Sequence, residues 1–265
     1  MLSANQQEKL KQYLGLLALE QKSKHWLSCV NKWLNEFVQS VDVQNVSQVT
    51  EYLKNLQDKM HPVTYKKEFY QIRRFLRESL ELNYLDKIRL PRVNAPLVKI
   101  VTNEDIRKTV EYFSNSKFYL RYRAFILLMS SSGLRPSEAW QLKLEDIDFV
   151  NRKIYIRVDA KHHTKTGKAR VAFFNEKTQF VLERYIKQNK NRRIFNESHF
   201  SRAFRHAPLR VKEFRKFFSQ EWTRRNGNHA VKEILMGHAQ SSVDAQHYLA
   251  LSEEDLKRIY DKVME

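Results

Sequence analysis

The pattern of apolar and polar residues predicts that the first part of the chain is helical. Four helical segments are expected, at about residues 5–21, 26–37, 47–59 and 62–82. The fourth opens with a proline, which suits the first turn of a helix because no backbone N–H is needed there. We therefore expect a helical domain over residues 1–88. The second segment shows the three- and four-residue spacing of one helix face most clearly, with Trp26, Val30, Trp33, Leu34 and Phe37.

A proline-containing stretch separates this part from the rest of the chain. Residues 87–99 read KIRLPRVNAPLVK, with two prolines and no clean periodicity. Proline disfavours the helical conformation in the residue before it, so the stretch is predicted to be extended. We place a linker at residues 89–99 and a second domain at residues 100–265.

The second domain is predicted to be mainly α-helical with a small β-hairpin or sheet. Thr102 and Asp105 form a capping pattern that opens a helix, and the next helix, at 119–131, is apolar on most sides, as a buried central helix is. Residues 153–158 alternate like a strand, and a second strand is expected at 170–174. The remaining helices are predicted at 176–188, 200–206, 211–225, 230–236 and 252–264.

Composition and charge point to a polyanionic partner. Lys and Arg number 48 against 30 Asp and Glu, which gives a net charge of +18 at neutral pH. Such an excess attracts nucleic acid above all. A membrane surface would be the alternative, but the sequence has no lipidation signal. With 42% hydrophobic residues, the chain has enough apolar side chains for a core.

Cysteine usage and the first residues predict an intracellular protein. Cys29 is the only cysteine, so neither an internal disulfide nor a cysteine-based zinc site is possible. The start, MLSANQQEKLKQ, lacks the apolar stretch of a signal peptide. The longest apolar run, 124–129, is far too short to cross a membrane.

Several kinds of catalytic and binding site are excluded because the sequence lacks their motifs. The histidines are scattered, and the adjacent pair His162 and His163 has no ligand four residues away, so we expect no metal. There is no glycine-rich phosphate loop and no GxSxG elbow. We expect no cofactor of any kind.

What remains is a set of cations and one tyrosine spaced over the second domain. Arg135 follows the buried helix and its closing glycine, and Lys212 and Arg215 lie one helical turn apart. Tyr248 lies ten residues beyond His238. The full set is Arg135, Lys165, Lys212, Arg215, His238 and Tyr248.

In this order, the set resembles the motifs of the tyrosine recombinases, or phage-type integrases. The family's first motif is matched by GLRPSEAWQLKLEDID, its hairpin lysine by TKTGKAR, its second motif by Lys212-Glu-Phe-Arg215 and its Gly-His by Gly237-His238. The resemblance covers about residues 102–248. It implies a two-domain DNA clamp, with a helical core-binding domain before the tyrosine-recombinase catalytic domain.

A finer resemblance is to archaeal integrases of the fuselloviral kind. These are similar in carrying lysine rather than histidine in the second motif, here in VKEFRKFF, and QHY around the tyrosine. The chain departs from the bacterial pattern at Lys212 and in the spacing of ten residues from His238 to Tyr248. Whether Lys212 or His238 assists the nucleophile stays open.

The resemblance gives each residue a role in cleaving and rejoining DNA without ATP. Arg135 and Arg215 would stabilise charge on the phosphate, since a guanidinium is a charged planar fork of donors. Tyr248 would attack phosphorus and form a 3′-phosphotyrosine. Lys165 would give a proton to the leaving 5′-oxygen, with Lys168 as the alternative. If Tyr248 is not the nucleophile, the nearest other candidate is Tyr260.

Further cations are expected to contact the DNA, and no metal is expected to take part. In the fourth helix the cations alternate with apolar residues, which would place the cations outward. The predicted DNA contacts are Lys66, Lys67, Arg73, Arg74 and Arg77 in the fourth helix, Arg89 and Arg92 in the linker, and Lys168 and Arg170 near the hairpin.

The resemblance also implies double-stranded DNA as partner and a tetramer on two paired sites. The apolar face of 252–264 is expected to dock on a neighbouring protomer, with packing on its own chain as the alternative. In the first case, removal of 252–265 would leave DNA binding and abolish recombination. Two other functions stay open: a type IB topoisomerase and a DNA-binding protein without catalysis.

Overall fold

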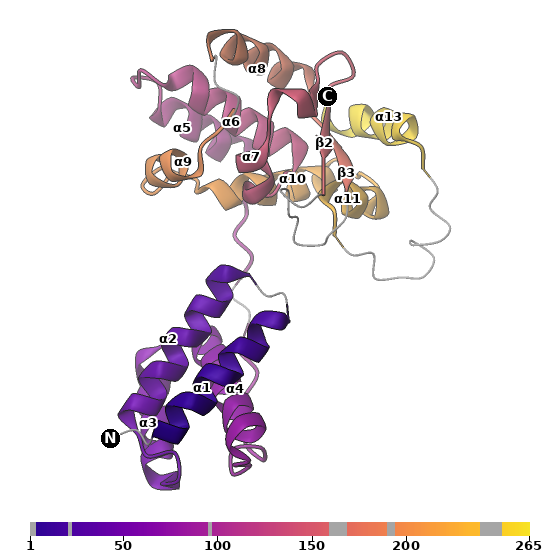
Figure 1. Ribbon diagram of the computed structural model, residues 1–265. Helices are drawn as coiled ribbons and strands as arrows, with labels where there is room; N and C mark the ends of the chain where they lie inside the picture. Colours follow the sequence, from indigo (N-terminus) through magenta and orange to yellow (C-terminus); the bar gives the residue numbers. More distant parts are fainter. Residues whose placement is uncertain (1–3, 21–22, 95–96, 159–168, 190–193, 239–250) are drawn as a thin grey trace. The chain divides into compact units, whose positions relative to one another are not determined.

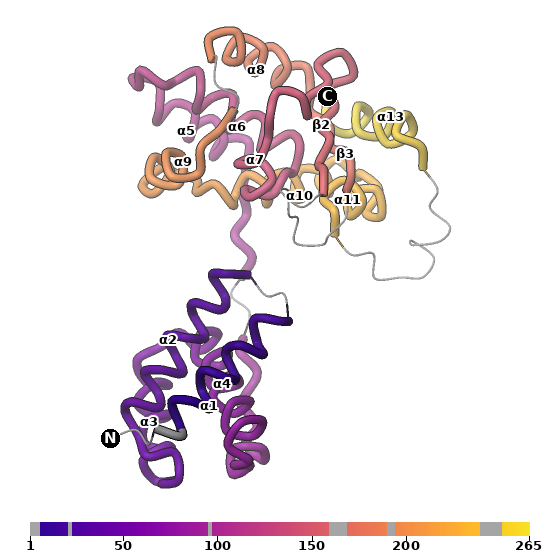
Figure 2. The backbone as a smooth tube through the Cα atoms, in the orientation of Figure 1, coloured from indigo at the N-terminus to yellow at the C-terminus, as the bar shows by residue number. Residues whose placement is uncertain are grey.

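The computed structural model divides the chain into two compact units, residues 1–97 and 98–265. It describes residues 4–20, 23–94, 97–158, 169–189, 194–238 and 251–265. Figures 1 and 2 show a helical first unit, and a second unit in which helices surround a small sheet. The prediction of a mainly α-helical chain with a small sheet is confirmed.

The first unit consists of four helices around one apolar core. Its helices are α1 (Ala4–Leu19), α2 (Lys24–Ser40), α3 (Val46–Lys59) and α4 (Pro62–Leu80). Side chains of Ser23, Asn45 and His61 accept backbone N–H groups at the starts of the last three helices, which stabilises donors that have no partner inside the helix. The core includes Leu34, Phe37, Phe69, Ile72 and Phe75, all at most 1% exposed.

One charged side chain lies inside this core. Glu68 of α4 is fully buried, and neither of its carboxylate oxygens has a hydrogen-bond partner among the described residues. Burial, followed by the negative charge of Glu36, raises the pKa of Glu68 to about 7. The folded unit therefore holds a proton that an unfolded glutamate would release.

This carboxyl group makes the stability of the first unit depend on pH. Between the ordinary pKa of 4.5 and the raised pKa of about 7, only the folded state keeps the proton, so stability falls as pH rises. The loss is on the order of 3 kcal/mol, since one pKa unit corresponds to about 1.4 kcal/mol. Hydrogen exchange of α4 amides, measured at several pH values, should show this fall in wild type and not in Glu68→Gln. Equal pH dependence in both would contradict the prediction.

The second unit is built around the buried helix α6 (Tyr119–Ser132). Residues Ala124–Met129 of α6 are at most 9% exposed, which confirms the prediction of a central helix. Around it lie α5 (Asn103–Tyr112), α7 (Pro136–Gln141), α8 (Glu176–Gln188), α9 (Glu197–Ala203), α10 (Val211–Arg224), α11 (His229–Met236) and α13 (Glu253–Met264). The helices α8 and α10 make the most extensive contacts with α6.

The sheet has three antiparallel strands in the order β1-β2-β3. These are β1 (Ile147–Asp148), β2 (Lys153–Ile156) and β3 (Arg170–Phe173), and β2 pairs with β3 in a register that sets Ile154 opposite Ala172. The two predicted strands are confirmed, each somewhat shorter than expected. The two-residue β1 was missed, because so short a segment carries no alternating pattern.

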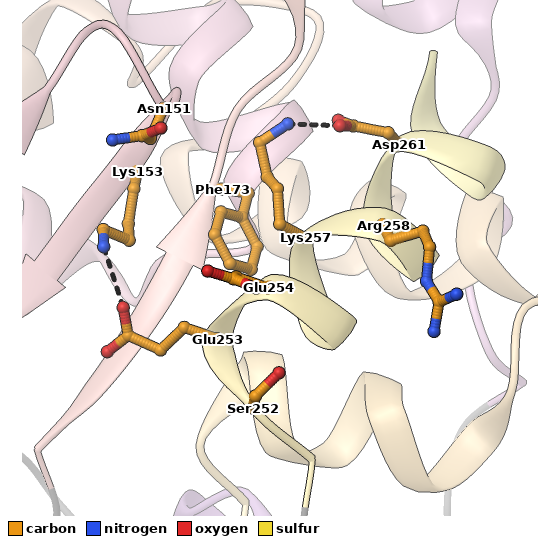
Figure 3. Close-up of a pocket in the computed structure, with 9 residues that line it drawn as sticks. All are labelled: Asn151, Lys153, Phe173, Ser252, Glu253, Glu254, Lys257, Arg258 and Asp261. Atoms are coloured by element: carbon orange, nitrogen blue, oxygen red, sulfur yellow. Dashed lines mark hydrogen bonds and ion pairs between the residues drawn. The ribbon is translucent and has the colours of Figure 1, made fainter.

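The last helix, α13, packs on its own chain. Its apolar residues Leu256, Tyr260, Val263 and Met264 are buried in one cluster with Phe173, Phe218 and Trp222. Ion pairs fasten it to the hairpin: Lys153 bonds Glu253 at 2.8 Å and Arg152 bonds Asp261 at 3.1 Å. Figure 3 shows the first of these pairs beside a pocket between the hairpin and α13. The face that we expected to dock on a neighbouring protomer is thus covered in this chain.

None of the helices that the structure describes is long and apolar enough to cross a membrane.

Candidate active site

A tight turn after α6 sets the position of Arg135. Gly133 closes α6 with φ of 63°, the left-handed conformation that glycine adopts without strain. A Cβ at this position would come within 2.5 Å of the ring of Phe218. Arg135 follows as the N-cap of α7, and its backbone N–H donates to Glu138 Oε2 at 2.7 Å. The arginine is therefore held through its backbone as well as its side chain.

A buried carboxylate joins two arginines at this turn. The side chain of Glu138 is 2% exposed, and it accepts hydrogen bonds from Arg135 Nη1 at 2.9 Å and from Arg170 Nη1 and Nη2 at 2.8 Å each. Burial opposes ionisation, but Arg170 and then Arg135 outweigh it and hold the pKa of Glu138 below its usual range. The carboxylate stays charged and fixes both guanidinium groups.

Arg170 is buried inside the second unit, whereas the sequence predicts that it contacts DNA. Its side chain is 7% exposed, forms the two-pronged pair with Glu138, and donates from Nε to Leu235 O at 2.9 Å. Pairs of this geometry are among the strongest in proteins. Arg170 thus links β3 to α7 and α11.

The end of α11 brings three arginines together. Each of its last carbonyl groups accepts from a different guanidinium: Leu235 O from Arg170, Met236 O from Arg215 at 2.7 Å, and Gly237 O from Arg135 at 2.6 Å. These carbonyls have no partner inside the helix and carry the negative end of its dipole. The helix end therefore offsets part of the repulsion among three clustered cations.

Arg215 bridges the two sides of the site. It lies on α10 and donates from Nη1 to Gly133 O at 2.5 Å and from Nη2 to Met236 O and towards His238 Nε2 at 2.9 Å. Burial, followed by the positive charge of Arg135, lowers the pKa of Arg215 to about 10. The guanidinium is still charged at neutral pH.

His238 lies just beyond α11, between Arg215 and a carboxylate. Gly237, with φ of 63°, turns the chain back so that the backbone N–H of His238 donates to Glu233 O at 3.0 Å. The ring then has Nδ1 at 2.8 Å from Glu233 Oε2 and Nε2 facing Arg215. A Cβ on Gly237 would come within 2.8 Å of the Arg170 side chain, so this turn requires glycine.

The structure brings Arg135, Arg215 and His238 together, with Lys212 nearby. Lys212 is exposed at the start of α10 and lines a pocket with Pro136, the residue after Arg135. The remaining members of the predicted set, Lys165 and Tyr248, and the alternative Lys168, lie outside the described residues.

Tyr260 is excluded as the alternative nucleophile. It is fully buried, its hydroxyl donates to Ser131 O at 2.9 Å, and burial raises its pKa well above the usual value. The enclosed hydroxyl cannot reach a DNA phosphate. Its raised pKa also disfavours the phenolate that would attack phosphorus.

The predicted DNA-contacting cations of the first unit differ in their exposure and in whether a carboxylate or an aromatic ring pairs with them. Lys67, Arg77, Arg89 and Arg92 are exposed and Lys66 is half-buried, whereas Arg73 lies over the Tyr70 ring, 4.7 Å from its centroid. Arg74 pairs with both Glu20 and Glu78, and Arg77 contacts Glu78 at 3.1 Å. Among the predicted DNA contacts of the first unit, Arg74 is thus the one whose charge is most fully compensated.

The site contains two acidic residues that the sequence motifs do not predict as members of it. Glu138 stands in the Ser-Glu of the first motif, and Glu233 stands five residues before His238. For Glu233, the one signal in the sequence is its position four residues before the glycine that ends the helix. Within the described ranges, no three His, Cys, Asp or Glu side chains are grouped so as to hold a metal ion.

Comparisons with known proteins agree with this architecture. Residues 99–255 match the model of the Phage integrase family. The chain is 25% identical to the tyrosine recombinase XerA of Pyrococcus horikoshii, over 96% of this chain and 92% of the relative. It is 27% identical to XerA of Saccharolobus solfataricus, over 76% of this chain and 68% of the relative.

Solved structures with the same fold include integrases bound to DNA. A lambda integrase (75–356) dimer bound to a COC′ core site has a TM-score of 0.73 at 15% identity, over 91% of this chain and 94% of that chain. The Tn1549 transposon integrase in complex with circular intermediate DNA has a TM-score of 0.68 at 16% identity, over 94% and 98%.

Proposed function

This chain belongs to the phage integrase family, whose model matches more than half of its residues, and from that membership we propose that it is a site-specific DNA recombinase. It cleaves and rejoins DNA through a 3′-phosphotyrosine intermediate. The observation that carries the proposal is the convergence of Arg135 and Arg215 on the end of α11, beside His238.

The arginine pair supplies what phosphate transesterification needs. Negative charge builds on the non-bridging oxygens in the transition state, and donors held in place beforehand stabilise it without reorganising. Arg135 and Arg215 are anchored by a carboxylate and by backbone carbonyls, and each guanidinium has five N–H groups, so both keep donors for a phosphate.

The other roles are assigned as follows. Tyr248 attacks phosphorus, and the phosphotyrosine conserves the bond energy for rejoining. Lys165, or Lys168 in its place, protonates the leaving 5′-oxygen. Lys212 and His238 bind the scissile phosphate. No metal or nucleotide cofactor takes part.

The two units share the grip on double-stranded DNA. Residues 1–88 form the core-binding domain, 89–99 the linker and 100–265 the catalytic domain. The net charge of +18 supports this assignment, and binding should weaken steeply with salt because each neutralised phosphate adds about 0.9 to the log–log slope. Lambda integrase has been solved as a tetramer bound to a Holliday junction. We infer that this protein likewise acts as a tetramer on paired sites, inside a prokaryotic cell.

The experiment is a comparison of wild type with Tyr248→Phe on negatively supercoiled plasmid and on nicked suicide substrates carrying candidate sites, without metal or ATP. We expect wild type alone to form an adduct that survives detergent and is removed by protease. The variant should form no such adduct, since only the phenolic oxygen forms the bond. Bound DNA without adduct from either protein on every substrate would contradict catalysis.

The same assay separates recombination from topoisomerase activity. A recombinase requires two cognate sites and exchanges strands between them. Relaxation of plasmids of any sequence, without strand exchange, would favour a type IB topoisomerase.

A further inference from the structure

We propose that Glu233 is a positioning residue for His238, one that holds the hydrogen on Nδ1 and, together with Arg215 on the other ring nitrogen, sets the tautomer and the orientation of the ring. This rests on the proposed function only in its kinetic consequence. The pairing itself follows from contacts among described residues: His238 Nδ1 lies 2.8 Å from Glu233 Oε2, and Nε2 lies 2.9 Å from Arg215 Nη2.

The two neighbours dictate the tautomer of the ring. A carboxylate only accepts hydrogen bonds, so the Nδ1 that faces Glu233 must carry a hydrogen. A guanidinium only donates, so the Nε2 that faces Arg215 must present its lone pair. With both contacts made, His238 is a neutral imidazole protonated at Nδ1.

The backbone explains why residues 233 and 238 meet. When a helix ends on a glycine in the left-handed conformation, the residue after that glycine folds back over the last helical turn. Its backbone N–H then donates to the carbonyl group five residues earlier. Here that bond joins the N–H of His238 to Glu233 O at 3.0 Å, after Gly237. Side chains at these two positions are usually apolar and touch. This chain has an acid and an imidazole in their place.

Electrostatics give Glu233 a second effect at the same place. The guanidinium of Arg215 is destabilised by burial and by Arg135 and Arg170, and it is stabilised by Glu138 and Glu233. Glu233 thus lies close enough to act on both partners of the Arg215–His238 contact. It supports the charge of Arg215 and orients the ring beside it.

The arrangement also assigns His238 its part in the chemistry. A carboxylate that accepts from one nitrogen of an imidazole fixes the direction in which the other nitrogen points. Because Lys212 stands where the family's second motif has histidine, His238 is the imidazole of the quoted motifs. Its Nε2 lone pair accepts from Arg215, so Glu233 sets the ring against the guanidinium that is assigned to the phosphate.

The direct test reads the tautomer in the full-length protein. Nitrogen-15 NMR of histidine side chains distinguishes a protonated from an unprotonated ring nitrogen, and His238→Gln assigns the signal. We expect a protonated Nδ1 in wild type and in Glu233→Gln, whose amide oxygen still accepts. In Glu233→Leu, which matches the size of the side chain and leaves an apolar contact, Arg215 still donates to Nε2, but Nδ1–H has no acceptor. Its proton signal should therefore leave the hydrogen-bonded range and exchange faster with water. An Nδ1–H signal unchanged in shift and in exchange rate in Glu233→Leu would overturn the proposal.

The kinetic test uses single-turnover cleavage of a nicked substrate. Loss of a carboxylate that orients a metal-ligating histidine costs about 10- to 100-fold. We expect a loss of that order here, so Glu233→Leu should slow cleavage by that factor with DNA affinity unchanged. Glu233→Gln should restore most of the rate. In a His238→Ala background, Glu233→Leu should have little further effect, because the ring that it positions is gone. An equal loss in both backgrounds would contradict positioning.

A matched control lies on the other side of the same carboxylate. His229 Nε2 is 4.0 Å from Glu233 Oε1, and its side chain is 78% exposed. His229→Ala should change neither the tautomer nor the rate. If wild type forms no Tyr248 adduct on any substrate, the proposed function fails while the NMR result still decides the pairing.

Discussion

Replacing Arg215 with lysine is expected to slow DNA cleavage by about 10²- to 10³-fold, the cost of losing one preorganised donor at a developing negative charge. The guanidinium reaches Gly133 O, Met236 O and His238 Nε2 with two of its nitrogens. A lysine ammonium is a single point and cannot span these acceptors while facing a phosphate. Single-turnover cleavage, with DNA affinity measured separately, checks the prediction.

Arg224→Lys is the matched control for this variant. Arg224 lies on the same helix, α10, pairs with Glu221 at 2.7 Å and donates to Val101 O at 3.0 Å, at 40% exposure. It shares the chemistry of Arg215 without the contacts to the α11 end, so cleavage should stay within about twofold. Equal losses in the two variants, or normal cleavage by Arg215→Lys, would disprove the assigned role.

Removal of residues 252–265 is expected to unfold the second unit. The deletion takes away Leu256, Tyr260, Val263 and Met264, all buried against the hairpin and α10. Burial of such side chains is worth about 1.5–3 kcal/mol each. The sum is comparable to the whole stability of a domain, about 5–15 kcal/mol. We therefore expect loss of cooperative melting and weakened DNA binding, measured by thermal unfolding and by a binding titration.

This expectation replaces the one drawn from sequence, in which the truncated protein still binds DNA. Arg258→Ala serves as the control, because that side chain lies on α13 and is 80% exposed. Arg258→Ala should unfold at the same temperature as wild type. If the truncated protein folds and binds a single site normally but fails to recombine, α13 acts on a neighbouring protomer and the packing within the chain is dispensable.

The sequence was sufficient for features that depend on neighbours along the chain. Helical spacing predicted α2, because a buried face repeats every three to four residues, and α6 was predicted from a segment that is apolar on most sides. Gly133 marked the end of α6, and the Thr102 and Asp105 capping pattern marked the start of α5. The motifs also sufficed for family membership, since their order along the chain needs no knowledge of contacts.

Only the tertiary structure shows the contacts between residues that are distant in sequence. Glu138 and Arg170 are 32 positions apart and Arg135 and Gly237 are 102 apart. No periodicity records such a pairing, since it depends on how α7, β3 and α11 pack around α6. For this reason the sequence predicts that Arg170 faces DNA, although it is buried in an ion pair.

The same reason separates the two tyrosines. By sequence, Tyr248 and Tyr260 differ only in spacing from His238 and in helical context, and α13 could equally have docked on another protomer. Packing against Phe173 and Trp222 buries Tyr260 and removes it from the choice. The chain's own order of residues thus determined its helices, its charge and its family, while the burial of each charged or phenolic group, and hence its part in the site, was decided by the fold.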